Sequence, residues 1–198
     1  EVTILVERLH DPACRLLTLI GPGGSGKTRL ALQATSQCLG AFLNGVFFVS
    51  LAAIDTADLI VPAIAHALHF AFHGQSDLKT EFLSYVSDKE ILLLLDNFEH
   101  LIDASDASRL VIEILQHAPE VKLLVTSRER LNLRSEWLIE VPGLEVPPAG
   151  CAPDDISGYS AAALFLQNAR RVRSGLMLDI NNASAIARIC QLVDGLPL

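Results

Sequence analysis

The segment GPGGSGKT, residues 21–28, constrains the fold of this chain more than any other part of its sequence. It satisfies the pattern GxxxxGK[ST], and it lies between an apolar run, residues 16–20, and a stretch of helical composition, residues 28–39. Glycines allow backbone N–H groups to turn inward around an anion, and a following helix directs free N–H donors toward the same point. We therefore expect a strand, a phosphate-binding loop and a helix, in that order.

Side chains at the end of this loop complete the expected anion site. Lys27 should reach the β- and γ-phosphates as a point charge, and the Thr28 hydroxyl should ligate Mg²⁺. A chance match in a glycine-rich turn is the alternative, but the strand before the loop and the helix after it disfavour that interpretation. The predicted cofactor-binding residues in this segment are Gly21, Pro22, Gly23, Gly24, Ser25, Gly26, Lys27, Thr28 and Arg29.

A phosphate-binding loop of this type needs an acidic residue at the end of a neighbouring strand, to hold Mg²⁺ through water. The apolar run ILLLL, residues 91–95, leads directly into Asp96, which we predict to be that acid. Many hydrolytic proteins carry a second acid at the next position, but here that residue is Asn97. Glu99 could polarise the attacking water instead; a surface residue at the start of the next helix is the alternative. We expect hydrolysis to be slow.

The next apolar run ends in VTSR, residues 125–128. A polar residue and an arginine at that strand end would lie beside the γ-phosphate, where a guanidinium group can sense or stabilise its charge. The alternative is a solvated turn, because Glu129, Arg130 and Arg134 make the following loop charged. Chain order and spacing favour a role for Arg128 at the phosphates.

Short apolar runs alternate with amphipathic stretches along the first 141 residues. Runs that are apolar on both faces are typical of parallel sheets covered by helices, so the pattern predicts an α/β doubly wound domain with right-handed crossovers. The predicted strands are residues 16–20, 46–51, 91–95 and 121–126, with residues 137–141 as a fifth. The predicted helices lie near residues 29–39, 58–69, 79–87 and 108–117.

A change of composition follows this domain. Four prolines and two glycines fall within residues 142–153, which excludes a helix or a central strand there. Residues 160–174 and 181–192 then read as two helices without a strand between them. We predict a nucleotide-binding domain over residues 1–143, a linker over 144–157 and a partial helical subdomain over 158–198. The abrupt end after two helices leads us to expect a piece of a longer protein.

The overall charge limits the partners of this segment. The formal net charge is −8 and the isoelectric point is near 5.1, which argues against non-specific nucleic-acid binding. No apolar run approaches the roughly 18 residues of a membrane span, and no leader pattern stands at the N-terminus. The four cysteines form no CxxC pair, so we expect reduced thiols. These features predict a cytoplasmic protein without membrane contact.

Five motifs in the same order give the chain its resemblance to a known family. They are GPGGSGKTRLAL, GVFFVSLAAI, LLLLDNFEHL, LLVTSRERLNL and ICQLVDGLPL. Together they resemble the ATPase module of STAND-class regulators, the bacterial relatives of NB-ARC domains. The resemblance implies an AAA-like P-loop NTPase of the ASCE group, with a five-stranded, mostly parallel sheet flanked by helices and followed by a small helical subdomain.

The resemblance also implies roles for particular residues. Residues 21–28 correspond to Walker A, Asp96 to the Walker B acid and Arg128 to a sensor-type arginine. Pro197, in the GLPL motif, would pack near the adenine or ribose. The implied cofactors are ATP or ADP with Mg²⁺. The implied partners are other domains of the same chain, an effector and a helical-repeat sensor, together with nucleotide-dependent self-association.

Three functions remain open from the sequence. The first is a regulatory switch set by ADP or ATP, with slow hydrolysis, in a bacterial signalling or transcriptional regulator. The second is a metabolic P-loop enzyme such as a small-molecule kinase, although no arginine-rich lid is evident. The third is a GTPase, but the sequence contains no NKxD motif to recognise guanine.

Overall fold

The computed structural model describes residues 1–74, 77–102, 105–174, 179 and 182–197. Its contacts divide the chain into two compact units. The first comprises Glu1–Gly21 and Lys27–Glu140, and the second comprises Pro22–Gly26 and Val141–Leu198. The domain limits inferred from the sequence, at residues 143 and 158, stay a prediction.

A five-stranded parallel sheet forms the centre of the first unit, in the order β2-β3-β4-β1-β5. The sheet confirms the predicted α/β class, and each strand lies within one residue of its predicted position. The strands are β1 (Leu16–Ile20), β2 (Val46–Ser50), β3 (Leu92–Asp96), β4 (Lys122–Ser127) and β5 (Glu136–Glu140). Because all pairings are parallel, the carboxyl ends of β1, β3 and β4 lie together at one edge of the sheet.

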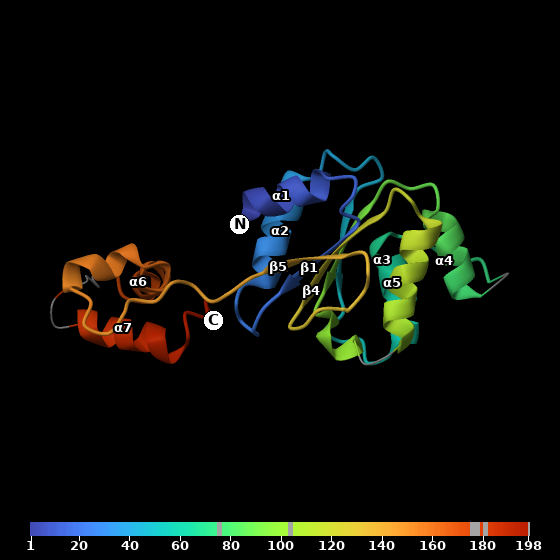
Figure 1. Ribbon diagram of the computed structural model, residues 1–198. Helices are drawn as coiled ribbons and strands as arrows, with labels where there is room; N and C mark the ends of the chain where they lie inside the picture. The colour runs from blue at the N-terminus through green and yellow to red at the C-terminus, as the bar shows by residue number, and fades with distance from the viewer. Residues whose placement is uncertain (75–76, 103–104, 175–178, 180–181, 198) are drawn as a thin grey trace. The chain divides into compact units, whose positions relative to one another are not determined.

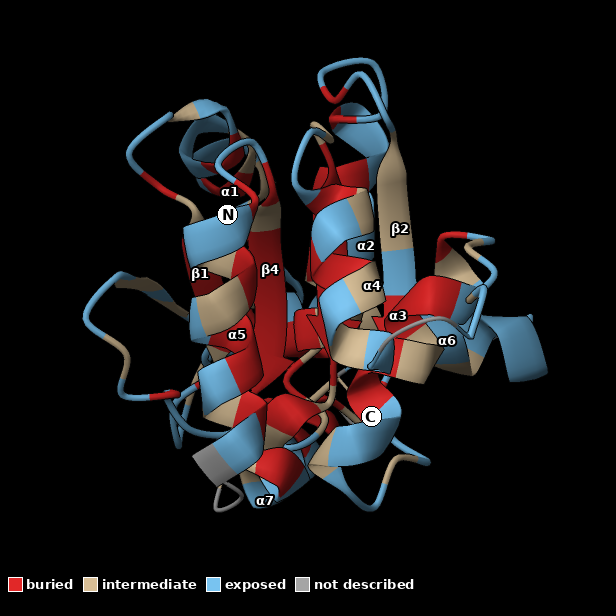
Figure 2. Ribbon diagram, turned by 90° about the vertical axis from the view of Figure 1, so that its right-hand side faces the viewer, coloured by how far each residue is buried: buried red, intermediate tan, exposed pale blue. Residues whose placement is uncertain are grey.

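Burial differs between the central and the outer strands. The three central strands are almost fully buried, whereas β2 and β5 are largely half-buried or exposed; Figure 2 shows this difference between β4 and β2. Phe48 in β2 remains 44% exposed. The prediction that residues 46–51 are buried on both faces is therefore wrong. An edge strand has a neighbour on one side only, so its flanks are less completely covered.

Helices cover both faces of this sheet, with α1 and α2 on one side and α3, α4 and α5 on the other (Figure 1). The helices are α1 (Val2–His10), α2 (Lys27–Gln37), α3 (Ile60–Ala67), α4 (Leu78–Val86) and α5 (Ser105–His117), with 3₁₀ turns η1 (Ala57–Leu59) and η2 (Phe98–Leu101). Helix α3 ends before the predicted residue 69 because His69 adopts a left-handed backbone, φ 54°. The N–H of Phe70 then donates to the carbonyl of Ala65 at 2.9 Å, which closes the helix.

The second unit contains η3 (Pro153–Gly158), α6 (Ser160–Val172) and α7 (Ala183–Leu192). Its small core is formed by residues of η3, α6 and α7, and Ile156, within the stretch predicted as a linker, is 1% exposed. Helix α7 begins at Ala183 with Asn182 as its N-cap residue. The predicted start at Asn181 lies outside the described residues, as does Leu198 of the GLPL motif.

A close backbone contact joins residues 143–144 to the end of α7. The N–H of Leu144 donates to the carbonyl of Gly195 at 2.8 Å. A Cβ added to Gly143 would overlap the carbonyl oxygen of Asp194, and one added to Gly195 would overlap that of Leu144. Gly195 also has a φ of +68°, which disfavours other residues. Both positions therefore require glycine, for reasons that only the fold reveals.

Replacing Gly143 by alanine should destabilise this contact by about 1–3 kcal/mol, because the methyl group meets rigid backbone. Gly158→Ala is the matched control, since a Cβ there meets no atom within 4 Å. We expect the control to change stability by less than about 0.5 kcal/mol. Hydrogen exchange of the α7 amides in the full chain measures the effect. Equal exchange rates in the two variants would contradict the steric account.

The four cysteines are free thiols; Cys14, Cys38 and Cys190 are buried and Cys151 is half-buried. Within the described part of the chain, no helix has the length and apolarity needed to cross a membrane.

Candidate functional site

The loop between β1 and α2 has the backbone that its glycines predict. Gly24 and Gly26 adopt φ angles of 81° and 92°, in the region that favours glycine. The N–H of Ser25 donates to the carbonyl of Pro22 at 3.2 Å, which closes a tight turn. Among the residues that the structure describes, the buried hydroxyl of Ser25 has no hydrogen-bond partner. A buried hydroxyl of this kind is available to a ligand in the loop.

Lys27 is the first residue of α2, and it is 8% exposed. Its Nζ donates to the carbonyl of Gly21 at 2.8 Å. Burial lowers the pKa of Lys27, and the negative charge of Glu99 opposes this shift more than that of Asp96 does. The ammonium group thus lies in a partly desolvated position, where an additional anion would interact with it strongly.

Asp96 is the last residue of β3 and is buried. Its Oδ1 accepts one hydrogen bond from the hydroxyl of Thr28 at 2.7 Å and another from the hydroxyl of Thr126 at 2.6 Å. The fold thus brings together Thr28 and Asp96, which the sequence predicted as the metal ligands although they stand 68 positions apart.

Thr126 is a site residue that the sequence analysis did not single out. Its hydroxyl donates to Asp96 and accepts a hydrogen bond from the N–H of Asn97 at 3.0 Å. The contact exists because β3 and β4 are neighbours in the sheet. The available signal was a polar residue at the end of an apolar strand, but its partner could be identified only from the strand order.

Glu99 and Arg128, predicted separately as base and sensor, form an ion pair. Arg128 Nε lies 3.1 Å from Glu99 Oε1, and the side chains are 64% and 18% exposed, respectively. Glu99 comes from η2, after β3, and Arg128 follows the end of β4. The cations Lys27 and Arg128 and the carboxylates Asp96 and Glu99 therefore all lie at this edge of the sheet.

Residues 1–132 match the NB-ARC domain family. The chain belongs to the NB-ARC family. It is 34% identical over 184 residues to "Putative HTH-type transcriptional regulator Rv0890c" of Mycobacterium tuberculosis, a match that covers 93% of this chain and 19% of that protein. It is 35% identical over 185 residues to "Uncharacterized protein Rv0894" of the same organism, a match that covers 93% of this chain and 44% of that protein. The chain thus spans less than half the length of either relative.

Solved structures share the fold of this NB-ARC domain. The Aeropyrum pernix ORC1 protein in complex with DNA aligns with a TM-score of 0.58 at 19% identity, over 97% of this chain and 58% of that one. AMPPCP-bound DnaA from Aquifex aeolicus aligns with a TM-score of 0.51 at 15% identity, over 100% of this chain and 61% of that one. These similarities agree with the AAA-like P-loop architecture expected from the sequence.

The residues of the NB-ARC domain fit a magnesium nucleotide. Thr28 and Asp96 offer oxygen ligands, the type that Mg²⁺ prefers, and they already lie within hydrogen-bonding distance. The buried lysine and the unpartnered hydroxyl of Ser25 are suited to phosphate oxygens.

Arg29 and Pro197 are the two remaining residues of the predicted cofactor-binding set. Arg29 is exposed on the first turn of α2. Pro197 belongs to the same compact unit as Pro22–Gly26, and its Cγ would lie 3.7 Å from a Cβ added to Gly26. The part that each plays toward a nucleotide remains a prediction.

Proposed function

We propose that this NB-ARC domain binds ADP or ATP with Mg²⁺ and acts as a regulatory switch in a larger bacterial signalling or transcriptional regulator. The convergence of Lys27, Thr28 and Asp96 behind a glycine-rich loop carries this proposal, because each group matches one part of a magnesium nucleotide. The name of the mycobacterial relative supports the wider context.

Each residue has a part in the proposed binding step. The backbone N–H groups of Gly23, Gly24 and residues 26–28 surround the phosphates, and Lys27 supplies a positive charge to the outer ones. Thr28 and Asp96 hold Mg²⁺, which neutralises phosphate charge when it is bound. Arg29 and Pro197 complete the nucleotide-binding set, Pro197 on the side of the adenine or ribose.

Hydrolysis by this domain should be slow. Asn97 follows Asp96 where a second acid would polarise water, so Glu99 is our candidate base. Glu99 is engaged by Arg128 at 3.1 Å, so this pair must open before either side chain can act on water or phosphate. Because Glu99 can act as the base only when this pair is open, we expect turnover to be slow.

Other domains of the full-length protein are the proposed partners, with an effector and a helical-repeat sensor among them. Nucleotide-dependent self-association is a second expected interaction. We assign nucleic-acid contacts to domains outside this segment, because its net charge of −8 opposes phosphate binding by its general surface.

Mass analysis of the nucleotide that co-purifies with the chain tests the proposal. We expect ADP or ATP in about one equivalent, released by denaturation. A guanine nucleotide would contradict the assignment. Phosphorylation of an added small-molecule acceptor at the expense of ATP would instead favour a metabolic kinase.

Replacing Glu99 by glutamine should reduce the rate of ATP hydrolysis at least about tenfold, because general-base catalysis typically contributes a factor of 10²–10⁴. Glu129→Gln removes the same charge from the loop after Arg128 and serves as the control. Phosphate release under single-turnover conditions is the measurement. Brisk hydrolysis that is unaffected by Glu99→Gln would show that the base lies elsewhere.

A further inference from the structure

The Glu99–Arg128 ion pair joins the two side chains that we predicted to act at the third phosphate of the nucleotide. Arg128 Nε lies 3.1 Å from Glu99 Oε1, while Glu99 Oε2 is buried and lacks a hydrogen-bond partner among the described residues. A carboxylate that is 18% exposed has little water to screen its charge. Its effect on a nearby phosphate is therefore larger than that of a surface acid.

The backbone around Glu99 is held firmly in place. Asn97 adopts a left-handed conformation, φ 64°, which turns the chain from β3 into η2. Phe98 and Leu101, on either side of Glu99, are 0% and 1% exposed. His100 Nε2 lies 2.7 Å from the carbonyl oxygen of Ile54. The backbone of Glu99 is thus held in a turn whose neighbouring side chains are buried, which keeps this residue close to the site.

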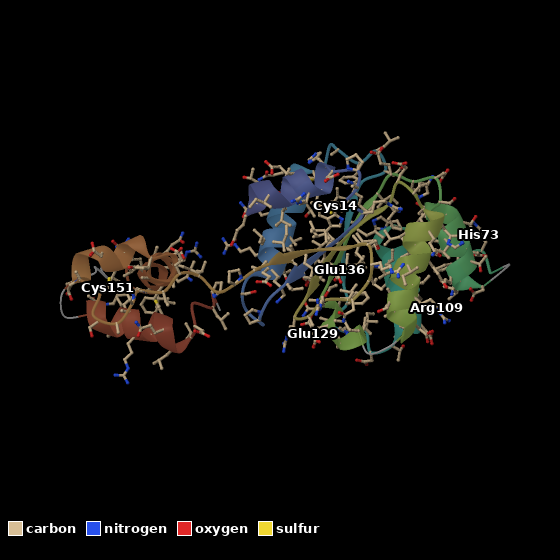
Figure 3. All side chains as sticks on the ribbon, viewed as in Figure 1. Cys14, His73, Arg109, Glu129, Glu136 and Cys151 are labelled. Carbon is tan, nitrogen blue, oxygen red and sulfur yellow. The ribbon has the colours of Figure 1, made fainter. Side chains whose placement is uncertain are left out.

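Arg128 begins a loop that is also anchored. The N–H of Glu129 donates to the hydroxyl of Ser127 at 3.2 Å, and the N–H of Leu131 donates to Glu136 Oε1 at 2.8 Å; Figure 3 labels Glu129 and Glu136. The Arg128 side chain itself is 64% exposed. Its backbone is therefore fixed, while its guanidinium group is free to change rotamer.

The charge of Glu99 reaches the predicted phosphate-binding lysine. Glu99 raises the pKa of Lys27 more than Arg128 lowers it, and more than Asp96 raises it. An additional phosphate would meet the poorly screened charge of Glu99, whereas the charge of Arg128 is opposed by Glu99 and screened by water. A diphosphate lacks the third phosphate, so the charge of Glu99 would affect its binding less.

We propose that Glu99 is a specificity determinant that makes this site favour a nucleoside diphosphate over a triphosphate. It does so by repelling the third phosphate and by holding Arg128 away from it. The inference rests on the proposed nucleotide-binding function, which it deepens. It predicts that a triphosphate can gain Arg128 only by displacing Glu99, so the ion pair and the triphosphate compete for one guanidinium group.

The test compares the affinities of ADP and a non-hydrolysable ATP analogue, each with Mg²⁺, by calorimetry on the full chain. In Glu99→Gln, the ratio of the ATP-analogue dissociation constant to that of ADP should fall about tenfold, equivalent to ~1.4 kcal/mol. Glu129→Gln, which alters an exposed acid next to Arg128, should change the ratio less than about twofold. A purely structural effect of Glu99→Gln would weaken both nucleotides and leave the ratio unchanged.

The double variant Glu99→Gln/Arg128→Gln separates the two parts of the proposal. In this double variant, the ratio of dissociation constants should fall by measurably less than in Glu99→Gln alone, because Arg128 is no longer present to bind the third phosphate. If wild type binds both nucleotides and the ratio is the same in Glu99→Gln, the inference is overturned while nucleotide binding stands. If wild type binds neither nucleotide, the proposed function fails and the inference fails with it.

Discussion

Replacing Lys27 by alanine should abolish the binding of ADP and ATP, with a loss in affinity of about a hundredfold or more, equivalent to ~2.7 kcal/mol. Lys27 is 8% exposed, and burial lowers its pKa, so it is partly desolvated before a nucleotide arrives. A charge-assisted contact in such a position is stronger than one at the surface. Titration calorimetry with both nucleotides measures the loss.

Lys89→Ala provides the control for Lys27→Ala, since Lys89 pairs with Asp88, whose side chain is 75% exposed. It removes the same charge and should leave both affinities within about twofold of wild type. Thermal unfolding without nucleotide checks that Lys27→Ala folds, because the variant also loses the bond from Nζ to the Gly21 carbonyl. An affinity within about tenfold of wild type in a folded Lys27→Ala protein would refute the phosphate-loop assignment.

Replacing Asp96 by alanine should remove the dependence of ATP binding on Mg²⁺ and reduce turnover at least about a hundredfold. Asp96 Oδ1 accepts hydrogen bonds from the hydroxyls of both Thr28 and Thr126. The substitution therefore removes one predicted metal ligand, Asp96, and leaves the other, Thr28, without this hydrogen bond. The ratio of ATP affinities in Mg²⁺ and in a chelator measures the effect, and it should approach one in the variant.

The variant Asp96→Asn distinguishes a metal role from a structural one. Asparagine keeps the size of the side chain and an oxygen acceptor, but it lacks the charge that Mg²⁺ prefers. We expect it to fold as wild type does and still lose Mg²⁺ dependence. Asp88→Ala removes an exposed carboxylate before β3 and should alter neither property. Unchanged Mg²⁺ dependence in Asp96→Asn would exclude Asp96 as the metal-binding acid.

Much of the fold follows from local pattern. Almost continuously apolar runs of four to six residues, separated by amphipathic stretches, predicted five strands of one parallel sheet to within one residue at each end. Helix limits were less predictable, because α3 stops where His69 turns left-handed rather than where the apolar pattern ends. The burial of β2 was also mispredicted, since its apolar residues do not reveal that it lies at the edge.

The candidate site could likewise be predicted from the sequence only in part. Glycine spacing, Lys27, Thr28 and an acid after an apolar strand could be recognised from the sequence because each depends on residues close together in the chain. The joint hold of Thr28 and Thr126 on Asp96 could not be recognised, because it links residues 68 and 30 positions from that acid. The strand order β3-β4-β1 brings them together.

The class of fold, the candidate phosphate loop and the identity of the charged groups could be read from the amino-acid sequence. Which of these groups meet depends on the fold: Glu99 and Arg128 were separate predictions, and the structure brings them together as an ion pair at 3.1 Å. It also decided that Gly143 and Gly195 must be glycines, because the carbonyls that exclude a side chain there come from distant parts of the chain. Local propensity is encoded in neighbouring residues, whereas contacts between strand ends depend on packing of the whole sheet.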